Sequence, residues 1–333
     1  MSEYVNPASP SLIDRLEPEM AVVEQQLARA TAHAEHSIAE AASHLAKAGG
    51  KRLRPMLTLL GSQLGSGVND EVLRAAVAVE LTHLATLYHD DVMDSATLRR
   101  GAPAAQEVWG NTVAILTGDL LFARASQIVA SLGADAVLIH AETFERLCVG
   151  QLQETLGAPA GADAVEHYIR VLADKTGSLI ATSARYGALF AGAGNEAVAI
   201  MEAFGEKVGV AFQLADDVID LSSDAATTGK TPGTDLREGV DTMPVLLLRR
   251  RADAGTLDAA GQVILERLAD DLASDEALAD VLADLRDHPV VEEARAMARD
   301  WAAAAVAELD PLPDSEVKET LREFAGLLVN RMA

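Results

Sequence analysis

Residues 70–94, DEVLRAAVAVELTHLATLYHDDVMD, join a long apolar run to three aspartates at its end. The apolar residues recur at helical spacing, which predicts one helix over residues 70–93. Asp90 and Asp94 are four residues apart, so they share one helix face, and Asp91 lies beside them. Like charges at this spacing repel, and the helix dipole disfavours anions at a C-terminus. The pattern therefore predicts a cation-binding site at the end of this helix.

The same arrangement occurs again at Asp216, Asp217 and Asp220, after an apolar run at residues 210–215. A single motif of this kind in an acidic protein could be a solvated acidic surface. Two motifs, each at the end of an apolar run, favour a functional site instead. Oxygen ligands suit a hard cation, and magnesium usually shares its coordination shell with water and substrate phosphates. We therefore expect both motifs to bind magnesium.

Helical periodicity continues outward from these motifs over nearly the whole chain. The other predicted helices cover residues 11–32, 35–47, 54–64, 112–131, 134–156, 165–173, 176–191, 195–221 and 242–251, with at least three more beyond residue 252. The 333 residues are 49% hydrophobic but only 4% aromatic, which favours helix over strand. We predict an all-α protein with one domain at residues 11–333, a loose leader at 1–10 and a polar loop at 222–239.

Charge and cysteine content exclude several classes of protein. The formal net charge of −24 disfavours binding to nucleic acid and to anionic lipid head groups. The single cysteine, Cys148, cannot form an internal disulfide, which fits a reducing compartment, and we expect it to be a small buried residue on a helix. No targeting segment and no uninterrupted membrane span is evident, so we expect a soluble cytoplasmic protein without stable membrane insertion.

Clustered cations stand out against this acidic balance. Gly49-Gly50-Lys51-Arg52-Leu53-Arg54-Pro55 opens a predicted helix, and Arg99-Arg100-Gly101 follows the first aspartate motif. Backbone amides at a helix N-terminus and guanidinium groups both suit phosphate oxygens. His83 lies two turns before Asp90 on the same predicted face, which favours a phosphate contact over a core position. The alternative for the arginines is a solvated surface, or pairing with the abundant acids.

These segments together resemble the trans-isoprenyl diphosphate synthase family. The resemblance rests on GGKRLRP, HDDVMD with RRG, DKTGSLI, and FQLADDVID with GKTPGTDL, in that order between about Gly49 and Pro244. It implies a bundle of long helices around a deep central cavity, commonly a homodimer. The implied activity is the magnesium-dependent addition of isopentenyl diphosphate to an allylic diphosphate.

The resemblance also assigns roles to residues. Magnesium would be held by Asp90, Asp94, Asp216, Asp217 and Asp220, with Asp91 in support. The allylic substrate would be bound by Arg99, Lys175, Thr176, Gln213 and Lys230, and isopentenyl diphosphate by Lys51, Arg54, His83 and Arg100. The aspartates, together with Arg99, Lys175 and Lys230, would carry the catalysis. One departure from the family is Val240, which follows Asp235-Leu236-Arg237-Glu238-Gly239 where many members have a lysine.

Product length should depend on the helix that precedes Asp90. One helical turn advances about 5.4 Å, close to the length of an isoprene unit, so a bulky residue one or two turns back would stop elongation. The residues at these places are Leu81, Thr82, Ala85 and Thr86, none of them aromatic. We therefore expect a medium- to long-chain product, around hepta- to decaprenyl, for a quinone side chain such as that of menaquinone. The alternatives are a short-chain farnesyl or geranylgeranyl diphosphate synthase, a class I terpene cyclase and a non-catalytic partner subunit.

Overall fold

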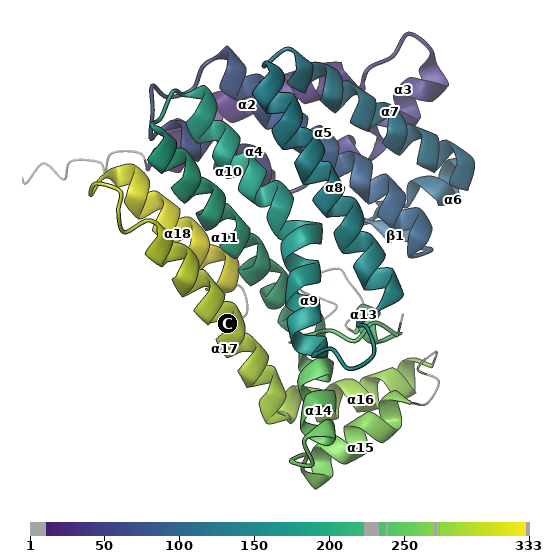
Figure 1. Cartoon of the computed structure of the whole chain (residues 1–333). Helices are drawn as coiled ribbons and strands as arrows, with labels where there is room; N and C mark the ends of the chain where they lie inside the picture. The colour runs from purple at the N-terminus through teal and green to yellow at the C-terminus, as the bar shows by residue number, and fades with distance from the viewer. Residues whose placement is uncertain (1–10, 223–232, 238, 270–271, 273, 331–333) are drawn as a thin grey trace, which may run out of the picture. The chain divides into compact units, whose positions relative to one another are not determined.

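The computed structural model describes residues 11–222, 233–237, 239–269, 272 and 274–330. Its helices are α1 Leu12–Arg15, α2 Glu17–Thr31, α3 His36–Lys47, α4 Leu53–Ser62, α5 Asp70–Met93, α6 Ala105–Trp109, α7 Asn111–Ala130, α8 Ala134–Leu156, α9 Ala164–Leu172, the π-helix η1 Ala173–Gly177, α10 Ser178–Phe190, α11 Asn195–Ser222, α13 Thr234–Arg237, α14 Met243–Asp253, α15 Ala259–Leu268, α16 Asp275–Asp287, α17 Pro289–Glu308 and α18 Glu316–Asn330 (Figure 1). The predicted all-α class is confirmed.

The contacts divide the chain into two compact units. Unit 1 takes its described residues from Met1–Ala141, Thr182–Glu202 and Pro311–Arg322, and unit 2 from Glu142–Ala181, Ala203–Asp310 and Glu323–Ala333. Each unit is considered by itself below. The first aspartate motif and the arginine clusters belong to unit 1, and the second aspartate motif belongs to unit 2.

Helix α5 is the centre of unit 1. It begins at Asn69, whose side chain accepts hydrogen bonds from the backbone N–H groups of Glu71 (2.9 Å) and Val72 (3.0 Å), as a helix N-cap should. It packs against α7, α4 and α2 (Figure 1). Side chains on several of its faces are therefore buried, which holds the last turn, with Asp90 and Asp91, in a fixed position.

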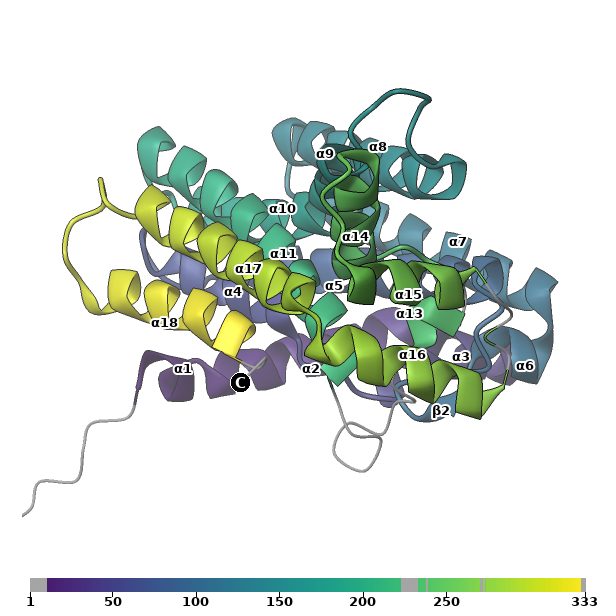
Figure 2. The same cartoon turned by 90° about the horizontal axis from the view of Figure 1, so that it is seen from below.

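Unit 2 has its own hydrophobic core, built from α9, the later part of α11 and helices α14 to α17. Helix α14 packs against α9 and α17, while α15 packs against α16 (Figure 2). Val210, Leu214 and Val218 on α11 are fully buried in this core. This packing fixes the C-terminal turns of α11, which carry the second aspartate motif.

The predicted helix positions agree closely with the structure, and the differences are local. Helices α5 and α8 have the predicted ends, whereas residues 11–32 form two helices, α1 and α2. A two-stranded hairpin, β1 Leu98–Arg99 and β2 Ala102–Pro103, was not expected from the sequence, nor was η1. The prediction that Cys148 is buried is wrong, because its position on α8 is exposed. The leader at 1–10 and most of the loop at 222–239 lie outside the described residues.

Candidate functional site

The first aspartate motif ends α5, and its three carboxylates differ in exposure. Asp90 is half-buried, Asp91 is fully buried and Asp94 is exposed at the helix C-cap. The chain leaves the helix through Ser95, which has a positive φ of 52°, and the backbone N–H of Ala96 donates to the carbonyl of Asp91 at 2.9 Å. The motif therefore presents Asp90 and Asp94 toward the outside of unit 1 and turns Asp91 inward.

Asp91 is held by Arg99 from the neighbouring hairpin. Nε of Arg99 donates to Oδ1 of Asp91 at 2.6 Å, and a second guanidinium nitrogen lies 2.5 Å from the same oxygen. Burial raises the pKa of Asp91, although the charge of Arg99 opposes this shift. Oδ2 of Asp91 is buried and has no hydrogen-bond partner in the described part of the chain. Asp91 is thus a positioned carboxylate with one oxygen still available for a donor or a cation.

The hairpin explains how Arg99 and Arg100 are presented together. Leu98 pairs with Pro103 and Arg99 with Ala102, which leaves Arg100 and Gly101 as the two turn residues. Both have positive φ, 54° and 76°, as a two-residue type I′ turn requires. The side chain of Arg99 contacts Asp91, while Nη1 of Arg100 donates to the carbonyl of Leu45 at 3.1 Å and to that of Gly49. The two adjacent arginines of this hairpin therefore contact both the aspartate motif and the glycine-rich segment.

Unit 1 brings most of the predicted isopentenyl diphosphate residues together. Burial, and then the positive charges of Arg54, Arg100, Arg99 and Arg52, lower the pKa of His83 well below its ordinary value. Burial also lowers the pKa of Arg54, to about 10, while the charge of Glu80 acts in the opposite direction. These four arginines and a neutral His83 thus form one basic cluster. Lys51 is exposed on the adjoining segment.

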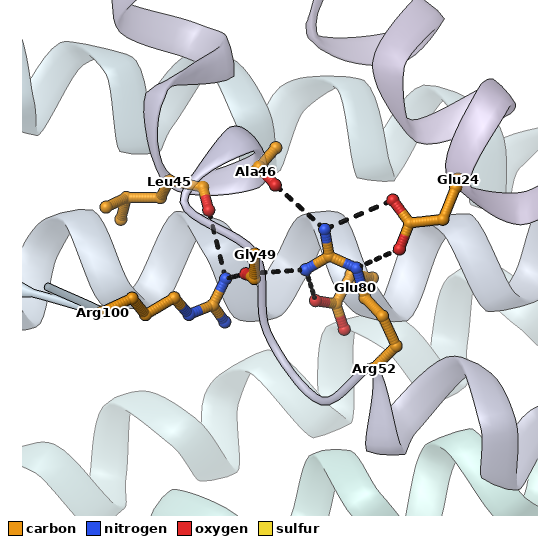
Figure 3. A network of polar contacts seen from close by, with 7 residues as sticks. All are labelled: Glu24, Leu45, Ala46, Gly49, Arg52, Glu80 and Arg100. Atoms are coloured by element: carbon orange, nitrogen blue, oxygen red, sulfur yellow. Dashed lines mark hydrogen bonds and ion pairs between the residues drawn. The ribbon is translucent and has the colours of Figure 1, made fainter. Parts of the chain in front are cut away.

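Arg52 and Glu80 connect this cluster, although the sequence motifs gave Arg52 no role and did not point to Glu80. Arg52 is buried and bonded to Glu80, which is only 2% exposed on α5 (Figure 3). A signal was present, because Glu80 interrupts the apolar run of residues 75–81, and a charge in such a run is rarely buried without a partner.

The second aspartate motif lies in the last turns of α11, and its middle residue is also buried. Asp217 is 2% exposed; its Oδ2 accepts a hydrogen bond from the Tyr168 hydroxyl at 2.9 Å and one from the backbone N–H of Met243 at 3.4 Å. Burial, followed by the negative charge of Asp235, raises the pKa of Asp217 to about 8. Asp216 and Asp220 are half-buried. Asp217 differs from Asp91 in having a hydroxyl rather than a guanidinium as its side-chain partner.

Lys175 and Thr176 lie on the π-helix η1 in unit 2. The Lys175 ammonium pairs with Glu154, and the Thr176 hydroxyl donates to Oε1 of Gln213 at 3.3 Å. Arg146 on α8 bonds Asp174 of this turn at 2.7 Å and Glu206 of α11 at 2.6 Å. A Cβ on Gly150 would lie 2.6 Å from the backbone nitrogen of Lys175, so only glycine allows α8 this close to η1. Single-turn π-helices are frequent at functional sites.

The predicted product-length residues occupy the middle of α5. Leu81, Thr82 and Ala85 are buried and Thr86 is half-buried. Tyr88, two residues before Asp90, is fully buried, and its hydroxyl donates a hydrogen bond to the Ala41 carbonyl at 2.5 Å. The Tyr88 ring therefore packs on α3. Lys230, predicted to bind the allylic substrate, lies outside the described residues.

Residues 35–284 match the sequence profile of the family described as Polyprenyl synthetase, so the chain belongs to this family. It is 43% identical to the nonaprenyl diphosphate synthase of Mycobacterium tuberculosis over 313 residues, 94% of this chain and 92% of that protein. It is 36% identical to heptaprenyl diphosphate synthase component 2 of Geobacillus stearothermophilus over 313 residues, 93% of this chain and 95% of that protein. These relatives make the chain a prenyltransferase.

Solved structures agree with this assignment. A crystal structure of geranylgeranyl pyrophosphate synthase from Corynebacterium glutamicum, complexed with calcium and isoprenyl diphosphate, superposes with a TM-score of 0.84 at 42% identity, covering 100% of both chains. That solved complex contains calcium, a divalent cation that prefers oxygen ligands, together with an isoprenyl diphosphate.

Proposed function

We propose that this chain is an all-trans polyprenyl diphosphate synthase. It would add isopentenyl diphosphate units to an allylic diphosphate and release a product of around hepta- to decaprenyl length. The proposal rests on the repeated motif, in which a buried middle aspartate has a more accessible aspartate on each side of it in the sequence. It rests equally on the basic cluster of unit 1. This condensation needs carboxylates that bind a metal cation and positively charged side chains that bind a diphosphate.

The donor chemistry of the two motifs fits magnesium. Asp90, Asp94, Asp216 and Asp220 supply only carboxylate oxygens and are not fully buried. No group of three His, Cys, Asp or Glu side chains within the described residues is arranged to hold a metal by itself. Magnesium is usually held by one or two carboxylates together with water and substrate phosphates, so the accessible carboxylates of each motif fit this ion. When bound, the ions would act as Lewis acids on the allylic diphosphate.

The side chains of the protein would bind and orient the two substrates and would protect the allylic cation from water. Arg54, Arg100 and Lys51 would hold isopentenyl diphosphate, and the neutral His83 would donate a hydrogen bond without adding charge. Arg99, Lys175, Thr176, Gln213 and Lys230 would bind the allylic substrate. Apolar walls would keep water from the allylic cation. Among the described residues we assign no side-chain base, so the released diphosphate would accept the proton that leaves after carbon–carbon bond formation.

A single product assay tests the proposal. The purified protein would be incubated with farnesyl diphosphate, isopentenyl diphosphate and magnesium, and the products separated by chromatography. We expect chains of about seven to ten isoprene units, as the names of the nonaprenyl and heptaprenyl relatives suggest. Products that stop at four units or fewer would contradict the long-chain proposal but keep the family activity.

A short-chain product is the second candidate. The observation in its favour is the 42% identity to the geranylgeranyl pyrophosphate synthase of Corynebacterium glutamicum. Against it, the α5 positions one and two turns before Asp90 carry no aromatic residue that could stop a growing chain. A class I terpene cyclase is disfavoured, because both motifs here are aspartate-rich and the basic cluster is present.

The variant Ala85→Phe tests where the growing tail runs. We expect shorter products, because the new ring would occupy space one turn before Asp90. Ala85 is 1% exposed, so the variant also risks an overpacking cost of about 1–3 kcal/mol, which an unfolding curve measures. A folded variant with unchanged product length would show that the tail takes another route.

We further propose that the protein works as a cytoplasmic homodimer. By length and composition α7 could cross a membrane, but it is also the main packing partner of α5, and it suits a soluble helical bundle. Val113 and Leu116 on α7 and Leu138 on α8 are exposed within unit 1, and a second copy of the chain would cover them. Light scattering should give twice the mass of one chain. Because one relative is called component 2, turnover that appears only with a second protein would indicate a heteromeric enzyme instead.

A further inference from the structure

Arg52 is the most fully bonded side chain of the basic cluster, and its contacts join three segments of unit 1 (Figure 3). Its guanidinium donates to Glu24 at 2.5 and 3.4 Å, to Glu80 at 2.9 Å, and to the carbonyls of Gly49 at 3.2 Å and Ala46 at 3.0 Å. Arg52 itself has a positive φ of 49°, a strained value for a non-glycine residue. These contacts hold the strained segment between α3 and α4 in one conformation.

Glu80 supplies the buried negative charge at the centre of this arrangement. It is 2% exposed on α5, and its charge acts on Arg52, Arg54 and Arg100. Burial alone would lower the pKa of Arg52, but bonding to Glu24 and the charge of Glu80 raise it overall. Without Glu80, the guanidinium groups of Arg52, Arg54 and Arg100 would repel one another and would lose a carboxylate whose charge acts on all three.

The segment held by Arg52 also contacts the guanidinium of Arg100. Nη1 of Arg100 and Nη1 of Arg52 both donate to the Gly49 carbonyl. A Cβ on Gly50 would lie 2.8 Å from Cζ of Arg100, so the guanidinium rests directly on this glycine. A shift of residues 49–52 would therefore move the guanidinium of Arg100 as well.

We propose that Glu80 and Arg52 are a positioning pair that sets the geometry of the isopentenyl diphosphate subsite. They act through Arg54 and Arg100 and do not themselves touch the substrate. This inference rests on the proposed function. It gives a role to Arg52, which belongs to the GGKRLRP motif but was assigned none, and to Glu80, which lies outside the motifs. It makes Glu80 the residue that orders the cations around it.

Two physical effects of Glu80 predict opposite results. If its charge only weakened the positive field, then Glu80→Gln would strengthen attraction for a diphosphate and lower the KM for isopentenyl diphosphate. If Glu80 positions the arginines, the same variant would loosen them and raise this KM. We expect the second effect to dominate, because binding of a diphosphate by guanidinium groups depends on the direction of each donor.

The test measures both substrates on the purified full chain. In Glu80→Gln we expect the KM for isopentenyl diphosphate to rise about tenfold or more, as for the loss of a charged hydrogen bond, with the KM for the allylic diphosphate within about twofold. Glu202→Gln is the matched control, because it removes a different arginine–glutamate pair of unit 1, to Arg185 at 2.8 Å, and should change neither constant. An unchanged or lowered KM for isopentenyl diphosphate in Glu80→Gln would overturn the proposal.

A second variant covers the case in which Glu80→Gln does not fold. Arg52→Lys keeps the charge but cannot bond Glu24, Glu80 and both carbonyls at once, so it should raise the same KM by a smaller factor. An unchanged value would equally overturn the proposal. If the wild-type chain makes no product, the proposed function fails. Calorimetric titration with isopentenyl diphosphate would then still decide whether Glu80→Gln weakens binding.

Discussion

The two aspartate motifs have the same sequence pattern but lie in different electrostatic surroundings. In the first, the middle aspartate is paired with Arg99 and lies beside a cluster of arginines. In the second, the middle aspartate accepts a hydrogen bond from the Tyr168 hydroxyl, and the negative charges of Asp235 and Asp216 raise its pKa. Identical spacing therefore does not mean identical chemistry. The outer aspartates should act alike, and the middle ones should not.

The largest expected effect tests the shared part of this comparison. Asp90→Asn and Asp216→Asn should each lower kcat about 10²–10³-fold, because each would remove one of the carboxylates proposed to bind the ions that stabilise the leaving diphosphate. Steady-state assays with saturating magnesium would measure this loss. Asp284→Asn, in a surface pair with Arg267, is the control and should leave kcat unchanged. If only one of the two variants lost activity, the motifs would not have equivalent roles.

The two middle aspartates should differ in how much each contributes to the free energy of unfolding. Asp91→Asn breaks an ion pair whose acid is fully buried and whose arginine is 30% exposed, so we expect a loss of about 2–3 kcal/mol, less than for a fully buried pair. Asp217→Asn should cost about 1 kcal/mol or less, because a carboxyl whose pKa is about 8 is largely protonated at neutral pH and resembles an amide. Urea unfolding without metal measures both. Equal losses would remove the difference between the motifs.

The smallest effect concerns the pH dependence of stability that arises from His83, which burial keeps neutral. His83 is surrounded by arginines, and its lowered pKa means that only the unfolded chain gains a proton as the pH falls below 6.5. Stability from this group is therefore complete above pH 6.5 and decreases below it, by at most about 1.4 kcal/mol per pH unit. His83→Gln should lessen this decrease in thermal unfolding between pH 7 and 5. A slope equal to that of the wild type would place His83 in contact with solvent.

Much of the fold follows from local sequence, because long helices carry a strong periodic signal. The ends of α5 and α8 were predictable, since Asn69 caps the first and the apolar spacing continues through the second. The hairpin at Arg100 was not, because a two-residue turn without Asn or Asp gives little sign of its positive φ values. The π-helix at Lys175 depends on contacts of Gly150 from α8, which no local window contains.

The candidate site was predictable in its chemistry but not in its organisation. The motifs identified the aspartates and the cations, and the structure collects Arg54, His83 and Arg100 in one cluster. The contribution of Glu80 depends on three arginines from two segments that meet only in the folded chain. Because the Glu80 side chain is buried, its charge acts on the neighbouring arginines and is not exposed to solvent.

The turn at Arg100 and Gly101 has a consequence for how the length of this loop can vary. Arg99 and Arg100 are adjacent, so their Cα atoms are about 3.8 Å apart across one peptide bond. Their side chains nevertheless engage different partners, Asp91 and the carbonyl of Leu45. Inserting or deleting one residue here would shift both arginines at once. Engineered loop exchanges between related enzymes should therefore keep this segment at its present length.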